Sequence, residues 1–428
     1  MKNDQVPVGR RDADRAPAMA ENRIDRIRPD APELAAPGDH VIGVTTMSFT
    51  REAVPDVARA TEDGVEEYDR EITVEVWYPA AEGTEAGGSY TALLRDGVTE
   101  VQLRGRAARD AAPAAQGAFP LVLVSHGYPG NRFLMSHLAE NIATKGYVVA
   151  SIDHPDSTYD DMGPFGSTLV NRPHDQAFVL DRMAGLDDPI GAITDGDTAA
   201  VIGYSMGGYG ALVLSGAGLT DTFRALPYAP PQQLLEINAM GSETLAALPD
   251  ERVRAVVAIG PWGRNREAWD AEGLSAIDTP LMLIAGGVDD VSGYEAIRSI
   301  FMETTRTERH LLTFDNANHN AAAPMPAPEE SWAVSESLGY APFDHYADPV
   351  WDTVRMNNIT QHFVTAFLDL HLKSDTAKAE YLDLVPDSAD AVWDRAEDGT
   401  PHETDTYWTG FANRSAKGLR FETRNVGQ

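Results

Sequence analysis

Short aliphatic runs alternate with longer helical patterns from Phe119 onward, and this rhythm constrains the fold more than any other feature of the chain. The runs cover 119–124, 147–152, 199–204, 253–259, 281–285 and 310–314. Helical patterns lie between or after them, at 132–144, 174–186, 206–216, 293–302 and 351–372. Such alternation is typical of a parallel sheet with crossover helices on both faces. We therefore predict an α/β fold with a mostly parallel central sheet.

Two upstream segments, 41–49 and 72–78, alternate apolar and polar residues with a period of two. This pattern is typical of half-exposed antiparallel strands, which we expect at one edge of the sheet. With the parallel strands they define one predicted domain over 39–373.

Four segments depart from the rhythm. Residues 1–38, rich in Asp, Arg, Pro and Ala, lack the apolar core of a secretory signal and are predicted to form a flexible extension. Residues 220–250, with prolines and short amphipathic patterns, are a candidate lid or cap, the alternative being part of the static body. Residues 320–350 are predicted to be an irregular loop, and 374–428 a tail packed on the domain.

The run VIGYSMGGYG places Ser205 at the centre of a G-x-S-x-G motif, between an aliphatic strand and a helical pattern. That context forces a sharp strand-to-helix turn that exposes the serine hydroxyl on a strained backbone. Gly203 and Gly207 are needed because side chains there would collide across the turn. Ser205 is therefore the predicted nucleophile.

A serine hydroxyl is a poor nucleophile near neutral pH, so a base must take its proton and an acid must orient that base. The strand at 281–285 runs into Asp289 and Asp290, and the strand at 310–314 is followed by His319. Both loops belong at the carboxyl edge of the sheet, in the chain order Ser, acid, His. We predict Asp289 as the acid, with Asp290 as the alternative, and His319 as the base.

Backbone N–H groups that stabilise an oxyanion are expected from Met206, the residue after the nucleophile, and from Tyr128 in the loop after the first parallel strand. His126 in the same loop is predicted to be a structural support. Several aromatic residues fall on loops at this edge and are either pocket walls or core anchors. Of these, Tyr128 and Trp262 are the predicted substrate-binding residues.

Five segments resemble those of the serine-nucleophile α/β-hydrolases, within the dienelactone hydrolase, platelet-activating-factor acetylhydrolase-like and cutinase-like esterase group. They are HGYPGNR, KGYVVASIDHPDSTYDD, GYSMGGYG, AGGVDDVSGY and ANHNAAAP. The resemblance spans roughly 39–372. It implies the α/β-hydrolase fold and esterase chemistry. Dienelactone hydrolases use a Cys nucleophile, and this chain has none.

Charge and composition exclude several classes of function. The chain has 34 Lys and Arg against 66 Asp and Glu, a formal net charge of −32. Because nucleic acids bind by releasing counterions to basic residues, we expect no nucleic-acid partner. The absence of Cys excludes disulfides, thiolate metal sites and a cysteine nucleophile. No apolar stretch approaches the roughly 18 residues of a membrane-spanning helix.

We also expect neither a metal nor a cofactor. Asp153, Asp156, Asp160 and Asp161 lack the spacing of a calcium-binding loop and are predicted to form a solvated loop.

The residues together predict a carboxylic ester hydrolase that acts on a small-molecule ester. Ser205 would attack the carbonyl, His319 would carry the proton, and Asp289 would hold the imidazolium while an acyl-enzyme forms. An acyltransferase or a peptidase with the same triad is an alternative. A non-catalytic binding protein on this fold is another, although such a protein would be expected to have lost a triad member. The sequence indicates neither a compartment nor an oligomeric state.

Overall fold

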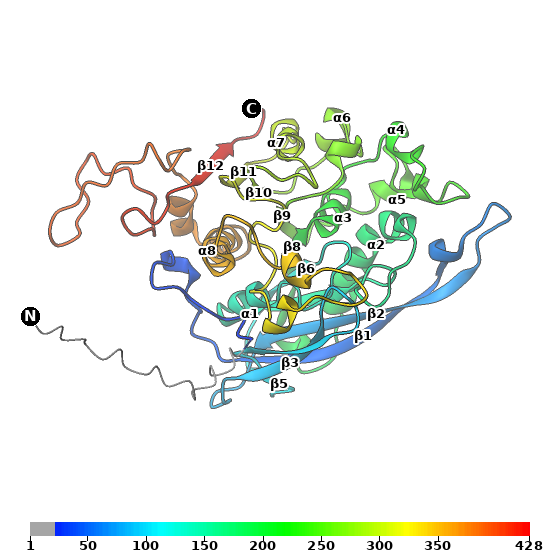
Figure 1. The fold of residues 1–428 in the computed structure, drawn as a ribbon, viewed down its shortest axis with the longest axis horizontal. Coiled ribbons are helices and arrows are strands. Elements are labelled where there is room, and N and C mark those ends of the chain that lie inside the picture. The colour runs from blue at the N-terminus through cyan, green and yellow to red at the C-terminus, as the bar shows by residue number, and fades with distance from the viewer. Residues whose placement is uncertain (1–21) are drawn as a thin grey trace, which may run out of the picture.

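Within residues 22–428, which the computed structural model describes, the strands form one ten-stranded sheet and one two-stranded hairpin (Figure 1). The strands are β1 (Ile42–Pro55), β2 (Glu67–Pro79), β3 (Gly88–Leu93), β4 (Glu100–Gly105), β5 (Ala108–Arg109), β6 (Phe119–Ser125), β7 (Val148–Asp153), β8 (Thr194–Tyr204), β9 (Val253–Ile259), β10 (Leu281–Gly286), β11 (Arg309–Phe314) and β12 (Leu419–Arg424). The large sheet has the order β12-β11-β10-β9-β8-β6-β7-β2-β1-β5, and β3 pairs with β4.

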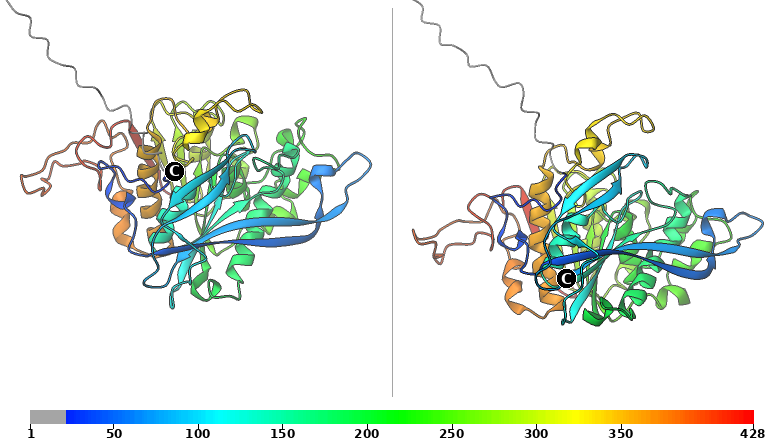
Figure 2. Two further views of the ribbon diagram at one scale, coloured as in Figure 1. Left: turned by 60° about the horizontal axis from the view of Figure 1, so that its bottom comes forward. Right: turned by 90° about the horizontal axis from the view of Figure 1, so that it is seen from below.

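Six neighbouring strands, from β11 to β7 in that order, are parallel, and each matches one of the predicted runs to within a few residues. At one edge, β2 pairs antiparallel with β7 and β1 pairs antiparallel with β2, as the period-two pattern predicted. The predicted α/β fold with a mostly parallel sheet is confirmed. Figure 2 shows β1 and β2 as a long twisted ribbon that extends past the rest of the sheet.

Helices cover both faces of the sheet (Figure 1). The α-helices are α1 (Ser136–Thr144), α2 (Phe165–Ala184), α3 (Met206–Leu214), α4 (Asp221–Arg224), α5 (Glu243–Ala246), α6 (Ala271–Leu274), α7 (Tyr294–Glu303) and α8 (Thr353–Leu372). Short 3₁₀ turns lie at Glu33–Ala35, Val57–Arg59, Gly191–Ile193, Leu234–Asn238, Arg264–Arg266, Glu329–Trp332, Pro342–His345 and Thr376–Tyr381.

Two hydrophobic cores result, one on each face of the sheet. Along β6, Val122 and Val124 pack into the core with α1 and α8, whereas Leu121 and Leu123 pack into the core with α2, α3 and α7. Successive side chains of a strand point to opposite faces, so a central strand must be apolar at every position. This is why the parallel strands read as continuous aliphatic runs.

Helix α2 begins at Phe165, nine residues before the helical pattern predicted at 174–186. Pro173 lies inside it and removes one backbone N–H, which leaves the carbonyl four residues earlier, at Leu169, without its helical donor. That carbonyl accepts hydrogen bonds from Tyr209 Oη (3.0 Å) and from Asn238 Nδ2 (3.2 Å) instead. Tertiary donors thus allow the helix to run through a proline.

The chain on either side of the predicted domain also packs on it. Residues 1–21 of the predicted flexible extension lie outside the described residues. The remaining part, 22–38, differs from that prediction, because Ile24 and Ala35 are buried and the Leu34 carbonyl accepts a hydrogen bond from Lys145 Nζ (2.6 Å). In the tail, β12 pairs antiparallel with β11, an addition to the sheet that was not predicted.

The two irregular segments within the domain are ordered around short helical turns. Residues 220–250 contain α4, α5 and the turn Leu234–Asn238, with Phe223 and Leu235 buried in the core beside α3. Residues 320–350 contain two 3₁₀ turns, and Tyr346 is fully buried. Whether 220–250 moves as a lid stays a prediction.

The packing of the tail can be tested at Phe421 on β12. Its ring stacks on Phe363 of α8 with centroids 4.8 Å apart, and it is 1% exposed. Phe421→Ala leaves a cavity in this core, so we expect a loss of about 3–5 kcal/mol in the free energy of unfolding, measured by chemical denaturation. The control Val426→Ala, at an exposed tail position, should leave stability unchanged. Equal stability of both variants would contradict a packed tail.

Candidate active site

Ser205 lies in a strained turn between β8 and α3, at the carboxyl edge of the sheet. Its backbone has φ 51° and ψ −109°, outside the regions that L-residues normally occupy. A Cβ on Gly203 would lie 2.2 Å from the Gly207 carbonyl oxygen, and one on Gly207 would lie 2.0 Å from the Ser125 carbonyl oxygen on β6. Only glycine fits at these two positions, so the turn packs directly against the neighbouring strand.

A continuous line of hydrogen bonds joins Ser205, His319 and Asp289. The Ser205 Oγ to His319 Nε2 distance is 3.0 Å, and the His319 Nδ1 to Asp289 Oδ2 distance is 2.9 Å. An ionised Asp289 can only accept, so Nδ1 carries the proton and Nε2 is left to accept from the serine. The three residues come from the loops after β8, β10 and β11, whose carboxyl ends lie at the same edge of the sheet.

Asp289 and Asp290 have different surroundings. Asp289 is 5% exposed, and its Oδ1 accepts from the backbone N–H groups of Val291 (2.9 Å) and Ser292 (2.8 Å). Burial acts to raise the pKa of Asp289, but the bonds from His319 and these two amides outweigh it, and the pKa is lowered. Asp290 is exposed, and its backbone N–H donates to Asn318 Oδ1. The imidazole therefore contacts the first of the two neighbouring carboxylates.

The backbone N–H groups of Tyr128 and Met206 lie in the turns that follow the adjacent strands β6 and β8. Neither has a hydrogen-bond acceptor among residues 22–428. An amide left without a partner beside the serine hydroxyl is available to a ligand oxygen. A Cβ placed on Gly127, which lies between β6 and Tyr128, would come within 3.2 Å of the Tyr204 ring. The two turns therefore approach each other closely.

Arg172 on α2, which no motif indicated, supports the loop after β6. Its guanidinium is 1% exposed and donates to the carbonyls of His126 (2.8 Å) and Gly127 (3.4 Å). Burial lowers the pKa of Arg172 to about 9. His126 is buried as well, with Nδ1 against the Gly127 carbonyl and Nε2 accepting from the His154 N–H. Burial, followed by the charge of Arg172, lowers the pKa of His126 well below its usual value, consistent with a structural support.

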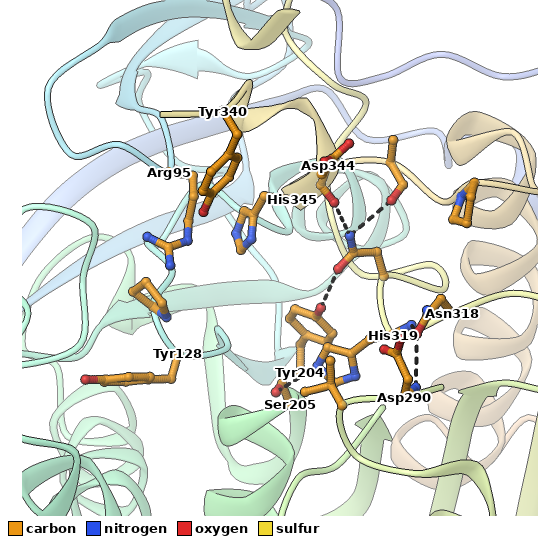
Figure 3. Close-up of a pocket in the computed structure, with 15 residues that line it drawn as sticks. Arg95, Tyr128, Tyr204, Ser205, Asp290, Asn318, His319, Tyr340, Asp344 and His345 are labelled. Atoms are coloured by element: carbon orange, nitrogen blue, oxygen red, sulfur yellow. Dashed lines mark hydrogen bonds between the residues drawn. The ribbon is translucent and has the colours of Figure 1, made fainter. Parts of the chain in front are cut away.

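A cavity of about 440 Å³ opens beside Ser205 and His319 (Figure 3). Its wall comes from residues 128–129, 204–205, 290–291, 318–320 and 340–349, and from Arg95 between β3 and β4. Asn320 connects the cavity wall to the turn that carries Ser205. Its amide oxygen accepts from Tyr204 Oη (3.0 Å), and its amide nitrogen donates to the carbonyls of Asp344 (2.7 Å) and Ala347 (3.0 Å). The loop after His319 therefore forms one side of the cavity.

Comparisons with known proteins place esterases among the proteins that this chain resembles. The family model for platelet-activating factor acetylhydrolase, isoform II, matches residues 66–160. Cutinase 1 of Thermobifida cellulosilytica and the cutinase of Thermobifida fusca (strain YX) are each 30% identical over 124 residues, 28% of this chain. The match spans less than half of these relatives, 42% of the first and 36% of the second.

The ferulic acid esterase from Streptomyces cinnamoneus has a similar structure, with a TM-score of 0.55 and 22% identity over 80% of this chain and 94% of that one. The chain has an α/β-hydrolase fold. The predicted resemblance to α/β-hydrolase esterases is confirmed, whereas a particular relation to the dienelactone hydrolases stays a prediction.

The aromatic residues predicted at this edge of the sheet have separate locations. Tyr128 lines the cavity, and its ring packs against Phe165 with centroids 5.0 Å apart. The Trp262 ring also packs against Phe165, with centroids 5.2 Å apart, and Trp262 does not line the cavity. Tyr228, from the candidate lid, joins the same ring cluster at 5.5 Å from Phe165. Tyr128 thus separates the cavity from a cluster that contains Trp262.

The four aspartates at the end of β7 and in the loop that follows it have separate partners. Asp153 pairs with Arg132, and Asp156 pairs with Arg70 (2.8 Å). Asp160 accepts from Thr158 Oγ1, and Asp161 accepts from the Asp156 N–H. Asp153 and Asp156 are therefore ion-paired. The prediction of a solvated loop did not include these two ion pairs. Within the part of the chain that the structure describes, no three metal-ligating side chains converge, and no helix is long and apolar enough to cross a bilayer.

The assignment of the imidazole partner can be tested spectroscopically. A proton held between His319 Nδ1 and the buried Asp289 carboxylate should give a ¹H NMR resonance well downfield of the amide region. Asp289→Asn should remove this signal, because a neutral amide no longer polarises the N–H. The control Asp290→Asn should retain it. Loss of the signal in the control alone would assign the contact to the neighbouring carboxylate.

Proposed function

We propose that the protein is a serine carboxylic ester hydrolase in which Ser205, His319 and Asp289 form the catalytic triad. The observation that carries the proposal is the line of hydrogen bonds from Ser205 Oγ through the imidazole to a buried carboxylate, at the mouth of a cavity. A nucleophile, a base within hydrogen-bond reach and an acid that orients the base are the parts that acyl transfer requires.

The reaction proceeds in two halves. Ser205 Oγ attacks the ester carbonyl while His319 Nε2 takes its proton, and the resulting oxyanion accepts hydrogen bonds from the N–H groups of Tyr128 and Met206. His319 then gives the proton to the oxygen of the leaving group, and the alcohol departs. Ser205 remains acylated. Water, deprotonated by the same imidazole, attacks the acyl carbonyl. The bond between that carbon and Ser205 Oγ then breaks as His319 Nε2 returns the proton to the serine oxygen, and the acid is released.

The relatives support an ester as the substrate. Two of them are cutinases and a third protein of similar fold is a ferulic acid esterase. The cavity beside Ser205 is of a size that suits a small-molecule ester. Among the predicted substrate-binding residues, Tyr128 lines this cavity, while Trp262 would act through the ring cluster behind it.

Replacing the nucleophile tests the proposal. Ser205→Ala should lower kcat on 4-nitrophenyl acetate by roughly 10⁶-fold, because triad members act as a unit. It should also abolish labelling by a fluorophosphonate probe, whereas Ser215→Ala, at a buried serine at the opposite end of the same helix, should still be labelled. Since the hydroxyl of Ser205 adds little to packing, the thermal melting of the variant should match that of the wild type. A Ser205→Ala variant that retained a tenth of the activity would refute the nucleophile.

The pH dependence of hydrolysis follows from the charge states of the triad. Only a neutral imidazole can accept the Ser205 proton, so kcat/KM should fall as the pH is lowered. The lowered pKa of Asp289 keeps its carboxylate ionised while this happens. A plot of log kcat/KM against pH should therefore have a limiting slope of about one on the acid side. A slope near two would mean that two protons must leave before the enzyme is active.

A further inference from the structure

Among residues 22–428, Arg95 is the one Lys or Arg that faces the cavity, in a chain whose net charge is −32. Arg95 lies in the connection between β3 and β4, and Figure 3 shows its guanidinium on the Tyr128 side of the cavity. Within residues 22–428 its guanidinium forms neither a hydrogen bond nor an ion pair; only its backbone N–H is bonded, to Tyr346 Oη (3.1 Å). The five N–H donors of the Arg95 guanidinium are therefore available to a ligand.

The connection that carries Arg95 is held in one conformation. Asp96 accepts from the N–H of Thr99 (2.9 Å) and from its hydroxyl (2.7 Å), which closes the turn. Gly97, with φ +72°, packs so tightly on the protein body that a Cβ there would lie 2.3 Å from the Tyr159 carbonyl oxygen. The Leu93 carbonyl also accepts from Asn131 Nδ2 (3.0 Å). The backbone of Arg95 is therefore fixed before any ligand arrives, which lowers the entropy lost on binding.

The charges around the cavity are unevenly placed. In the view of Figure 3, Asp290 lies on the other side of Ser205 from Arg95. Asp344 also lines the cavity, but it is exposed and presents its backbone carbonyl to Asn320. An anionic group on a bound ester would thus be attracted to the Arg95 side and repelled from the Asp290 side. The distribution favours one orientation of a negatively charged ligand.

We propose that Arg95 binds a carboxylate group carried by the substrate, so that the enzyme prefers esters that bear a free carboxylate over neutral esters of the same length. The proposal rests on the proposed esterase function. The planar guanidinium matches a carboxylate with two parallel hydrogen bonds, which a solvated surface lysine would not do. Because the protein as a whole repels anions, a fixed cation at the reaction site is what such a substrate needs.

The test compares matched esters on the full-length protein. On the acyl side, 4-nitrophenyl hydrogen glutarate is paired with the neutral 4-nitrophenyl valerate, and on the alcohol side, 4-acetoxybenzoate is paired with its methyl ester. In at least one pair the wild type should show a kcat/KM ratio of charged to neutral ester of roughly ten or more. The pair that shows it identifies the side of the ester on which the carboxylate lies.

Arg95→Gln should reduce that ratio to about one or below, and Arg95→Lys should restore only part of it, because the ammonium cannot bind the carboxylate through two parallel bonds. The control Arg104→Gln removes an exposed arginine from β4 of the same hairpin and should leave the ratio unchanged. Fluorophosphonate labelling of Ser205 verifies that each variant is folded.

A second measurement does not depend on any variant. Raising the salt concentration screens the charge of Arg95, so the ratio for the wild type should fall with added NaCl while the rate on the neutral ester changes little. A ratio near or below one for both pairs in the wild type, or a high ratio that persists in Arg95→Gln, would overturn the role of Arg95. Absence of hydrolysis of every ester, neutral ones included, would instead refute the proposed esterase function.

Discussion

The sharp turn at Ser205 is the constraint on which the rest of the site depends. A residue at φ 51° and ψ −109° costs about 1–3 kcal/mol, so surrounding contacts must hold it. The Ser205 N–H donates to the Ile259 carbonyl at the end of β9, and the Ser205 carbonyl accepts from the Trp262 N–H. Gly207 meanwhile sits against the end of β6. The strain is thus maintained by strands on both sides of β8, which also bring the turns of Tyr128 and Met206 together.

Much of this arrangement could be predicted from the sequence because it depends on local signals and one topological rule. Each parallel strand appears as an aliphatic run, and the loops after neighbouring parallel strands meet at one edge of the sheet. Ser205, Asp289 and His319 directly follow such runs, so their proximity needed no knowledge of packing. Spacing alone could not separate Asp289 from Asp290. The two carboxylates differ in their partners, because it is Asp289 that accepts from the backbone N–H groups of Val291 and Ser292.

The unpredicted parts depend on contacts between residues far apart in the chain. Helix α2 continues through Pro173 only because Tyr209 and Asn238 supply donors to the Leu169 carbonyl. Arg172 supports the loop after β6 through backbone carbonyls, which leave no trace in the sequence. The β3–β4 hairpin lies outside the ten-stranded sheet, and its place beside the cavity is set by packing on Tyr159 and Tyr346.

Asn320, the residue after His319, connects the wall of the cavity to the turn that carries Ser205. Asn320 contacts Tyr204, the neighbour of Ser205, and holds the backbone of Asp344 and Ala347. A shift of the 341–347 loop would therefore also displace the turn that carries Ser205 and the loop that carries His319. In this fold the loops at the carboxyl edge vary while the strands persist. Here one of those loops is hydrogen-bonded to the neighbours of the proposed triad, so the shape of the cavity and the geometry of the proposed proton transfer cannot change independently.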